Sequence, residues 1–430
     1  ILAKDINKEA PAPQPYYSPN DLVRTGNGKD SFGILRTFYV LGVERSYTIN
    51  KKLFGYPSKL EVGGRVYWER FIDDKQTGSS PDSRNGIYFI PAKTEEDAPV
   101  IVGQSHHYET TAFSGFISES IDMGTLKLRP GVRLEVFEQE RVDRLAGSLY
   151  QDKNLVVLLP GVGFIKNILG INIFGGVHRG FTPPSSGALK ILNFGKNASE
   201  TGLDLDAEKS WNKEIGIRGN ITLIDFEVSG FHVDIKNLVA AGRGTAFNNL
   251  GKVVSSGLEL RTKIHTSKLM RFLPQINISY TFLKTEVKDG KIKSNVSGSV
   301  GSEVSIAGKE LPYSPNNTLT VGLEGNYFNS LALRVDYRYV SEVYTDFENI
   351  EKADNLGITG TVPSYSHINL SANYSMNEKI RIFLSGKNIT DEIYIGSRLH
   401  SNPGQKQASL SSGILPGPRR QINLGLEYLF

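Results

Sequence analysis

Arginine side chains in the expected loops are the residues of this chain best suited to bind a ligand. A guanidinium group pairs with a carboxylate through two parallel hydrogen bonds, so such side chains suit an anionic ligand rich in oxygen. The loop arginines considered are Arg141, Arg144, Arg243 and Arg398. The ordinary alternative for each of them is a solvated charge on the loop surface.

Signs of catalysis or of a resident metal are much weaker. His106 and His107 could be read as a metal pair, but adjacent residues of a strand point to opposite faces, which makes joint ligation awkward. The chain has no cysteine, which excludes disulfides and thiolate ligands. No nucleophile elbow, zinc-protease helix motif or phosphate-binding glycine loop occurs. We therefore expect no enzyme and no cofactor.

The bulk composition narrows the possible partners. The net charge of +4 comes from 49 basic and 45 acidic residues, and the two signs are interspersed, so the chain is not expected to bind nucleic acid. No run approaches the roughly 18 consecutive apolar residues of a membrane-spanning helix. The composition is compatible with a membrane β-barrel, because the apolar residues of such a barrel are spread over short alternating segments.

Alternation of apolar and polar residues is the strongest pattern in the chain. Near the end, Ile422, Leu424 and Leu426 share one parity, and Asn423 and Glu427 share the other. In a strand these two sets face opposite sides. The same pattern predicts fifteen strands, near residues 33–50, 58–74, 106–121, 125–140, 153–164, 170–181, 207–219, 222–238, 249–265, 272–289, 313–327, 330–346, 363–376, 379–395 and 418–430.

Strand length favours a membrane barrel over a soluble sandwich. Most of the expected strands are about 12–18 residues long, enough to cross a membrane at a tilt, whereas strands of a sandwich average about five or six. We expect Arg334, Asp336 and Arg338 to form a charge ladder on the lumen side with Glu324. Aromatic residues at strand ends are expected to form the interfacial girdles of such a barrel, among them Phe347, Tyr374, Tyr394 and Tyr428.

Short turns and long loops alternate strictly along the chain, which predicts short periplasmic turns and long extracellular loops. Residues 1–32 are then expected to be an extracellular loop remnant, and residues 33–430 the barrel portion. An odd number of strands would leave open edges in the membrane, and unpaired backbone groups there are very costly. We therefore interpret the chain as the carboxyl-terminal part of a larger antiparallel transmembrane β-barrel.

Several short segments resemble the TonB-dependent outer-membrane receptors, most closely the ferric dicitrate receptor branch. The match runs from about Glu109 to Phe430, and no single motif in it is specific by itself. Its motifs are Leu128–Glu135, Glu208–Gly216, Asn249–Lys252 with Gly257–Glu259, Pro312–Asn316, Gly386–Tyr394 and Gly417–Arg420. The resemblance implies a bacterial outer-membrane receptor with a 22-stranded barrel, of which this chain supplies about fifteen strands and lacks the amino-terminal plug.

The resemblance also implies a function. Such a receptor imports an iron chelate, here ferric citrate, and takes energy from the TonB-ExbB-ExbD system through the plug; iron enters only as part of the chelate. Asn402 falls where this branch places a ligand-contacting asparagine, and Arg243 lies in a loop where it offers a polar contact. Gln104, His106 and His107 stand near the place of a binding arginine, which is missing here.

Alternative functions stay open at this point. Another siderophore, haem or cobalamin could be the ligand, because loop residues set the substrate. A passive outer-membrane pore is a further alternative, as is an outer-membrane protease or phospholipase, although no constellation of nucleophile and base is visible for the last two.

Overall fold

The structure, a computed structural model, describes residues 24–25, 30–78, 86–87, 89–90, 100–101, 104–143, 149–183, 207–241, 247–294, 302–398 and 413–430. Within these ranges the chain is all β apart from one short 3₁₀ helix, Thr266–Lys268. None of the described helical segments is long and apolar enough to cross a membrane.

All fifteen predicted strands are present, with ends that differ by up to eight residues, the largest difference being at the end of β20. They are β2 (Asp30–Leu53), β3 (Tyr56–Gly78), β7 (Gln104–Asp122), β8 (Leu126–Asp143), β9 (Leu149–Ile168), β10 (Ile171–Thr182), β11 (Glu208–Ile221), β12 (Ile224–Ala241), β13 (Phe247–Ile264), β14 (Gln275–Asp289), β17 (Asn317–Tyr327), β18 (Leu331–Val340), β19 (Tyr365–Ser375), β20 (Ile380–Lys387) and β23 (Gln421–Tyr428). Shorter strands lie between them: β1 (Arg24–Thr25), β4 (Gly86–Ile87), β5 (Phe89–Ile90), β6 (Val100–Ile101), β15 (Lys291–Lys293), β16 (Glu303–Ser305), β21 (Ile395–Arg398) and β22 (Ile414–Pro416).

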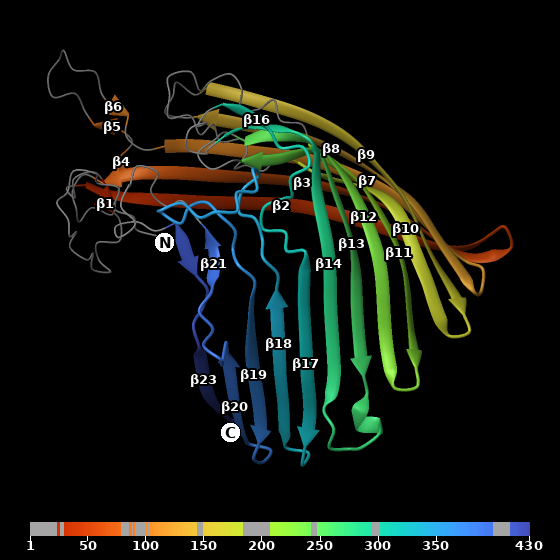
Figure 1. Ribbon diagram of the computed structural model, residues 1–430. Coiled ribbons are helices and arrows are strands. Elements are labelled where there is room, and N and C mark those ends of the chain that lie inside the picture. Colours follow the sequence, from red (N-terminus) through yellow and green to blue (C-terminus); the bar gives the residue numbers. More distant parts are fainter. Residues whose placement is uncertain are drawn as a thin grey trace.

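The fifteen long strands form one antiparallel meander in which each strand pairs with the next long strand along the chain. The sheet curves through space like the wall of a barrel (Figure 1). It is not closed: among the described residues, β23 pairs only with β20, and β2 pairs with β3 and the two-residue β1. The antiparallel β-architecture is therefore confirmed, while the full count of 22 strands stays a prediction.

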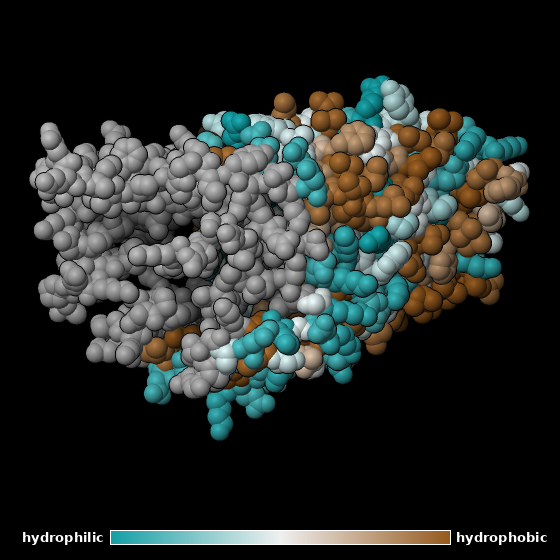
Figure 2. Space-filling view, turned by 90° about the horizontal axis from the view of Figure 1, so that it is seen from above, coloured by the Kyte–Doolittle hydropathy of each residue, from teal (hydrophilic) through white to brown (hydrophobic). Residues whose placement is uncertain are grey.

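The two faces of the sheet follow the sequence parity. Leu323, Val335 and Leu370 are register partners on adjacent strands, so they share one face. Their chain neighbours Glu324, Arg334 and Ser371 form the corresponding row on the other face. Large apolar side chains remain exposed on the first face, for example Leu424 at 75%, and hydrophobic patches cover much of the described surface seen from above (Figure 2). The face that carries Leu323, Val335 and Leu370 is therefore the outward, hydrocarbon-facing side of the wall.

The short turns confirm the predicted alternation of connections. Phe54 and Gly55 both have positive φ between β2 and β3, and Leu169 and Gly170 have it between β9 and β10. Two consecutive residues with positive φ are typical of a two-residue type I′ hairpin, whose twist matches that of the strands. These turns gather at the lower and right-hand edges of Figure 1, and the described long connection from β18 to β19 lies at the opposite end of its strands.

A small core forms where the long connections meet the sheet. Val253, Val287 and Ile306 are fully buried there, and Phe347 packs against them. The prediction of an interfacial aromatic girdle is thus wrong for Phe347 and Tyr394. Phe347 belongs to this core, and Tyr394 stacks on Tyr365 with ring centroids 4.2 Å apart. Tyr374 and Tyr428 keep exposed positions at strand ends.

The two motifs nearest the end of the chain form one junction that holds the final strands together. Asn388 Nδ2 donates hydrogen bonds to the backbone oxygens of Glu392 (2.9 Å) and Pro418 (3.0 Å). Asp391 accepts two hydrogen bonds from Arg419, from Nε at 2.9 Å and from Nη2 at 2.6 Å. A Cβ on Gly417 would overlap the ring of Tyr394 at 2.2 Å, so only glycine fits there. These motifs therefore have a structural role.

Outward and inward positions on one strand should differ sharply in their tolerance of charge. We expect Leu370→Arg in the centre of β19 to destabilise the intact barrel by about 2–4 kcal/mol, because the guanidinium would face hydrocarbon. The matched change Ser371→Arg, one residue along and on the opposite face, should cost far less. Heat-modified gel mobility and urea unfolding measure both. Equal destabilisation by the two variants would contradict the assignment of faces.

The junction should be sensitive to pH. The Arg419 guanidinium and the backbone amide of Arg420 lower the pKa of Asp391 below its ordinary value. The stabilisation is therefore complete above about pH 4, where an unfolded aspartate is ionised, and is lost as the pH falls toward the depressed pKa. We expect Asp391→Asn to lower the midpoint of thermal unfolding at pH 7. The difference in midpoint between the variant and the unmodified protein should become smaller below pH 4. The control variant Glu392→Gln, one residue away, should leave the midpoint almost unchanged. If the difference in midpoint caused by Asp391→Asn did not depend on pH, the role of the ion pair would be contradicted.

Candidate functional site

The inward face carries a ladder of paired charges. Arg334 Nε lies 2.8 Å from Asp336 Oδ2, and Arg334 Nη1 lies 3.6 Å from Glu324. Farther along the sheet, Arg381 pairs with Glu427, and Arg133 pairs with Glu135 while donating to Ser114 Oγ at 2.9 Å. The predicted association of Arg334, Asp336 and Glu324 is confirmed. Because these charges are paired, they can line a water-filled lumen without creating a large net electrostatic field.

Arg338 differs from the other arginines of the ladder. It is exposed, and no described carboxylate forms an ion pair with it. Its register partner on β19 is His367, so both side chains leave the same inward face near the ends of the strands that carry the long connections. The predicted ladder therefore stops at Asp336, and Arg338 presents a free guanidinium to the lumen within the described residues.

An aromatic stack completes this cluster. Tyr365 and Tyr394 stack at 4.2 Å, and His367 lies about 6 Å from each ring in a nearly parallel plane. Burial raises the pKa of Tyr394, which keeps its phenol protonated as a hydrogen-bond donor. His367 Nδ1 is buried with no hydrogen-bond partner among the described residues. We refer to Arg338, Tyr365, His367 and Tyr394 as the mouth cluster.

The chemistry available to the mouth cluster is recognition. A free guanidinium attracts carboxylate or other anionic oxygens, the imidazole nitrogen adds one more polar contact, and stacked rings offer a flat apolar surface. No nucleophile stands beside a general base in it. In the described part of the chain, no group of three or more His, Asp and Glu side chains is placed to hold a metal ion.

Arg398 is the predicted loop base that the structure describes in most detail. It is only 6% exposed, and its guanidinium donates to Thr361 O (2.9 Å) and Gly357 O (2.8 Å). The Tyr313 hydroxyl donates to its backbone oxygen at 2.7 Å. Arg398 thus fastens the long connection before β19 to the end of β21. This position is typical of a side chain that supports the loops and is not typical of one that contacts a ligand directly.

The remaining predicted site residues are only partly described. Gln104, His106 and His107 lie at the start of β7, and Arg141 lies near the end of β8. His107 pairs in register with Ile72 and Val142, so it stands on the opposite side of the sheet from its neighbour His106. The side chains of Gln104, His106 and Arg141, and the whole of Arg144, Arg243 and Asn402, lie outside the described residues.

Sequence reasoning missed His367 and Tyr365 altogether, and it assigned Tyr394 to the lipid interface. The alternation did contain a signal, because Tyr365 and His367 share the polar parity of β19 with Asn369 and Ser371. An aromatic residue on a polar parity near a strand end points into the lumen. The stacking with Tyr394, which comes from another segment, could not be read from spacing.

Solved structures with a similar fold include proteins described as a ferric citrate transporter, a siderophore receptor and a ferric-catecholate import receptor. The unliganded ferric citrate transporter FecA superposes with a TM-score of 0.72 at 18% identity, over 94% of this chain and 56% of that chain. The siderophore receptor PiuA from Acinetobacter baumannii gives 0.68 at 17% identity, over 92% and 56%. The ferric-catecholate import receptor Fiu from E. coli K12, in its closed form, gives 0.66 at 16% identity, over 92% and 55%. The chain spans little more than half the length of these proteins.

A family profile agrees with the fold and covers most of the chain. The family described as "TonB dependent receptor-like, beta-barrel" matches residues 6–389. Together with the alternating faces, the long tilted strands and the short hairpins on one side, this places the chain in the bacterial outer membrane, in a family of transport receptors. The chain belongs to the TonB-dependent receptor-like β-barrel family.

Proposed function

We propose that this chain is the barrel portion of an outer-membrane receptor that imports an iron chelate, with ferric citrate as its substrate. In this proposal residues 1–32 are an extracellular loop remnant and residues 33–430 form the barrel wall. Import takes its energy from the TonB-ExbB-ExbD system through an amino-terminal plug. Family membership supports the general class, and the inward face of the sheet supports the substrate class.

The mouth cluster is the observation that carries the substrate class. Ferric citrate is an anionic chelate whose surface is rich in carboxylate oxygens, and an unpaired guanidinium is the side chain that recognises such groups best. Arg334, two residues before Arg338, is neutralised by Asp336 and Glu324, whereas Arg338 has no described ion-pair partner. Arg338 is exposed beside half-buried aromatic rings, so its charge is open to an anionic ligand.

Loop residues complete the proposed site above the mouth cluster. Asn402 and Arg243 are the first candidates, and Gln104, His106, His107, Arg141 and Arg144 are further ones, all in or next to connections that the sequence predicts to be extracellular. Arg398 takes a supporting part, since its guanidinium is bound to loop carbonyls.

A catecholate siderophore is the second candidate substrate, and one observation favours it. Tyr365 and Tyr394 form a half-buried stack on the inward face, and aromatic rings of a catechol would extend such a stack. The solved structures of similar fold include a receptor described as a ferric-catecholate importer.

Neutralising Arg338 should weaken binding of an anionic chelate. We expect Arg338→Gln, in the full-length receptor, to reduce ferric citrate binding by about tenfold or more, because a charge-assisted hydrogen bond contributes about 1.5–3 kcal/mol. Radiolabelled ferric citrate bound to whole cells measures the effect. Arg334→Gln is the matched control, because it changes an arginine of the same strand that is already paired. Unchanged binding in Arg338→Gln would contradict the role of the mouth cluster.

The loop candidates can be tested separately from the mouth cluster. We expect Asn402→Ala combined with Arg243→Gln to reduce ferric citrate binding while leaving barrel assembly unchanged, because both side chains are expected in extracellular loops. Binding of a catecholate chelate is measured in parallel. Loss of catecholate binding alone would favour the second substrate, and no binding of either chelate by the unmodified receptor would overturn the proposal.

A further inference from the structure

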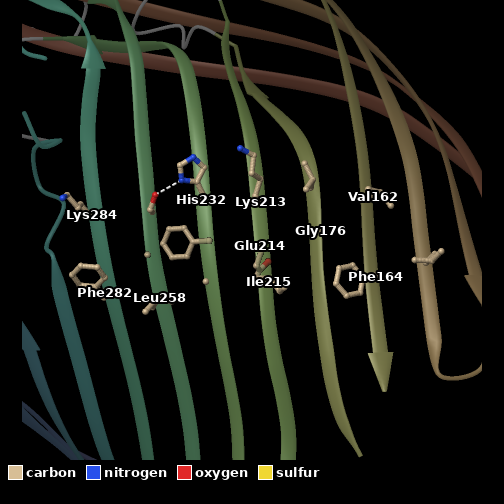
Figure 3. Close-up of a pocket in the computed structure, with 16 residues that line it drawn as sticks. Val162, Phe164, Gly176, Lys213, Glu214, Ile215, His232, Leu258, Phe282 and Lys284 are labelled. Atoms are coloured by element: carbon tan, nitrogen blue, oxygen red, sulfur yellow. Dashed lines mark hydrogen bonds between the residues drawn. The ribbon is translucent and has the colours of Figure 1, made fainter. Parts of the chain in front are cut away.

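The outward face of the sheet contains an apolar groove that the transport function does not use. It has a volume of about 760 Å³ and runs across β8 to β14 (Figure 3). Its floor is formed by apolar side chains on the hydrocarbon-facing parity: Leu128, Val162, Phe164, Val177, Ile215, Leu258 and Phe282. Gly230 sits between Ile215 and Leu258 in register and leaves the floor hollow there.

A row of polar side chains closes the upper end of the groove. Lys213 pairs in register with His232, His232 with Ser256, and Ser256 with Lys284, so the four residues lie side by side on four consecutive strands. Figure 3 shows Lys213, His232 and Lys284 above the apolar floor. Since neighbouring strands are about 4.8 Å apart, the row is about 14 Å wide. We refer to Lys213, His232, Ser256 and Lys284 as the cationic row.

Ion pairs and hydrogen bonds order part of the cationic row. His232 Nδ1 lies 2.8 Å from Ser256 Oγ, and His232 Nε2 lies 3.2 Å from Asp234. Asp234 also pairs with Lys213 at 3.1 Å and with Lys252 at 3.3 Å. One carboxylate therefore serves two lysines and a histidine.

The balance of charge around the row is positive. Lys284 forms no ion pair among the described residues, while the nearby carboxylate of Glu286 is engaged by Lys288 at 2.6 Å. Lys209, Lys236 and Lys252 follow on the same face, and they are register partners of one another. This surplus of lysines on a hydrocarbon-facing parity attracts anionic groups at that level.

The height of the cationic row matches the edge of the bilayer. His232 is eight residues beyond Ile224, the first residue of β12, and Lys284 is nine beyond Gln275, the first residue of β14. A transmembrane strand needs about 9–11 residues to cross the hydrocarbon core. The row thus lies at the far interface from the short turns, at the level of the outer-leaflet headgroups, and the groove lies at the level of the upper acyl chains.

We propose that this surface is a binding site for a phosphate-bearing lipid of the outer leaflet. The phosphate oxygens contact Lys213 and Lys284, with His232 between them, and the acyl chains occupy the groove above Ile215, Leu258 and Phe282. Lysine is a point-charge donor suited to phosphate, and the groove supplies the apolar contact that a free phosphate ion would not use. The site is on the outside of the wall, so it is separate from the mouth cluster.

Native mass spectrometry of the detergent-purified full-length receptor tests the proposal. The probes are bis-phosphorylated lipid A, the same lipid after removal of both phosphates, phosphatidylcholine and inorganic phosphate. We expect the phosphorylated lipid to bind best. Lys213→Gln combined with Lys284→Gln should weaken its binding about 30-fold, since each lysine near an anionic lipid surface contributes about 1 kcal/mol.

Two further variants separate the parts of the site. Lys263→Gln with Lys387→Gln is the matched control, because it removes the same charge from the opposite parity of the sheet, and it should leave lipid binding unchanged. Leu258→Trp should fill the groove and weaken lipid binding without a change of charge. Equal binding of phosphorylated and dephosphorylated lipid, equal loss in the control variant, or inorganic phosphate competing as strongly as the lipid would each overturn the proposal.

Discussion

The structure depends on the need of every backbone amide and carbonyl to form a hydrogen bond where no water is present. In hydrocarbon an unpaired group is very costly, which leaves the paired β-wall as one of two possible solutions. The meander of fifteen long strands meets this need strand by strand. Once the backbone is paired this way, side chains of alternate parity must face hydrocarbon and lumen, and the rest of the molecule follows from that division.

The same division separates the two surfaces that could bind a ligand, the mouth cluster on the inward face and the cationic row on the outward face. On the inward face, charges are mostly paired within the ladder, and Arg338 in the mouth cluster stands out because it is not. On the outward face, the apolar side chains of the groove, such as Ile215 and Phe282, give way to charged side chains at the cationic row and beyond it. A guanidinium facing water can select an anionic chelate, whereas lysines at the edge of the hydrocarbon can select an anionic lipid. Opposite faces of one wall thus suit different partners.

The long connections show why an arginine in a loop is ambiguous evidence for ligand binding. Arg398 has the type and position of a contact residue, yet it is buried and bound to carbonyl oxygens of residues about forty positions earlier in the chain. Irregular backbone exposes many carbonyl groups, and a planar guanidinium with five donors satisfies several of them at once. The motif around Asn388 behaves similarly: its side chain closes the junction of the last strands.

The strands, their faces, and the alternation of short turns and long connections could be predicted from the amino-acid sequence. Each of these depends on local periodicity of two residues or on turn chemistry, so they can be read without knowing which segments meet. The family could be predicted from the order of short motifs. Which polar residues come together became visible in the folded chain. The stack of Tyr365 on Tyr394, the burial of Arg398, and the row from Lys213 to Lys284 join residues from separate strands or loops. Register between strands creates such neighbours, and parity along one strand restricts register only to shifts of two residues, which leaves the choice of neighbour open.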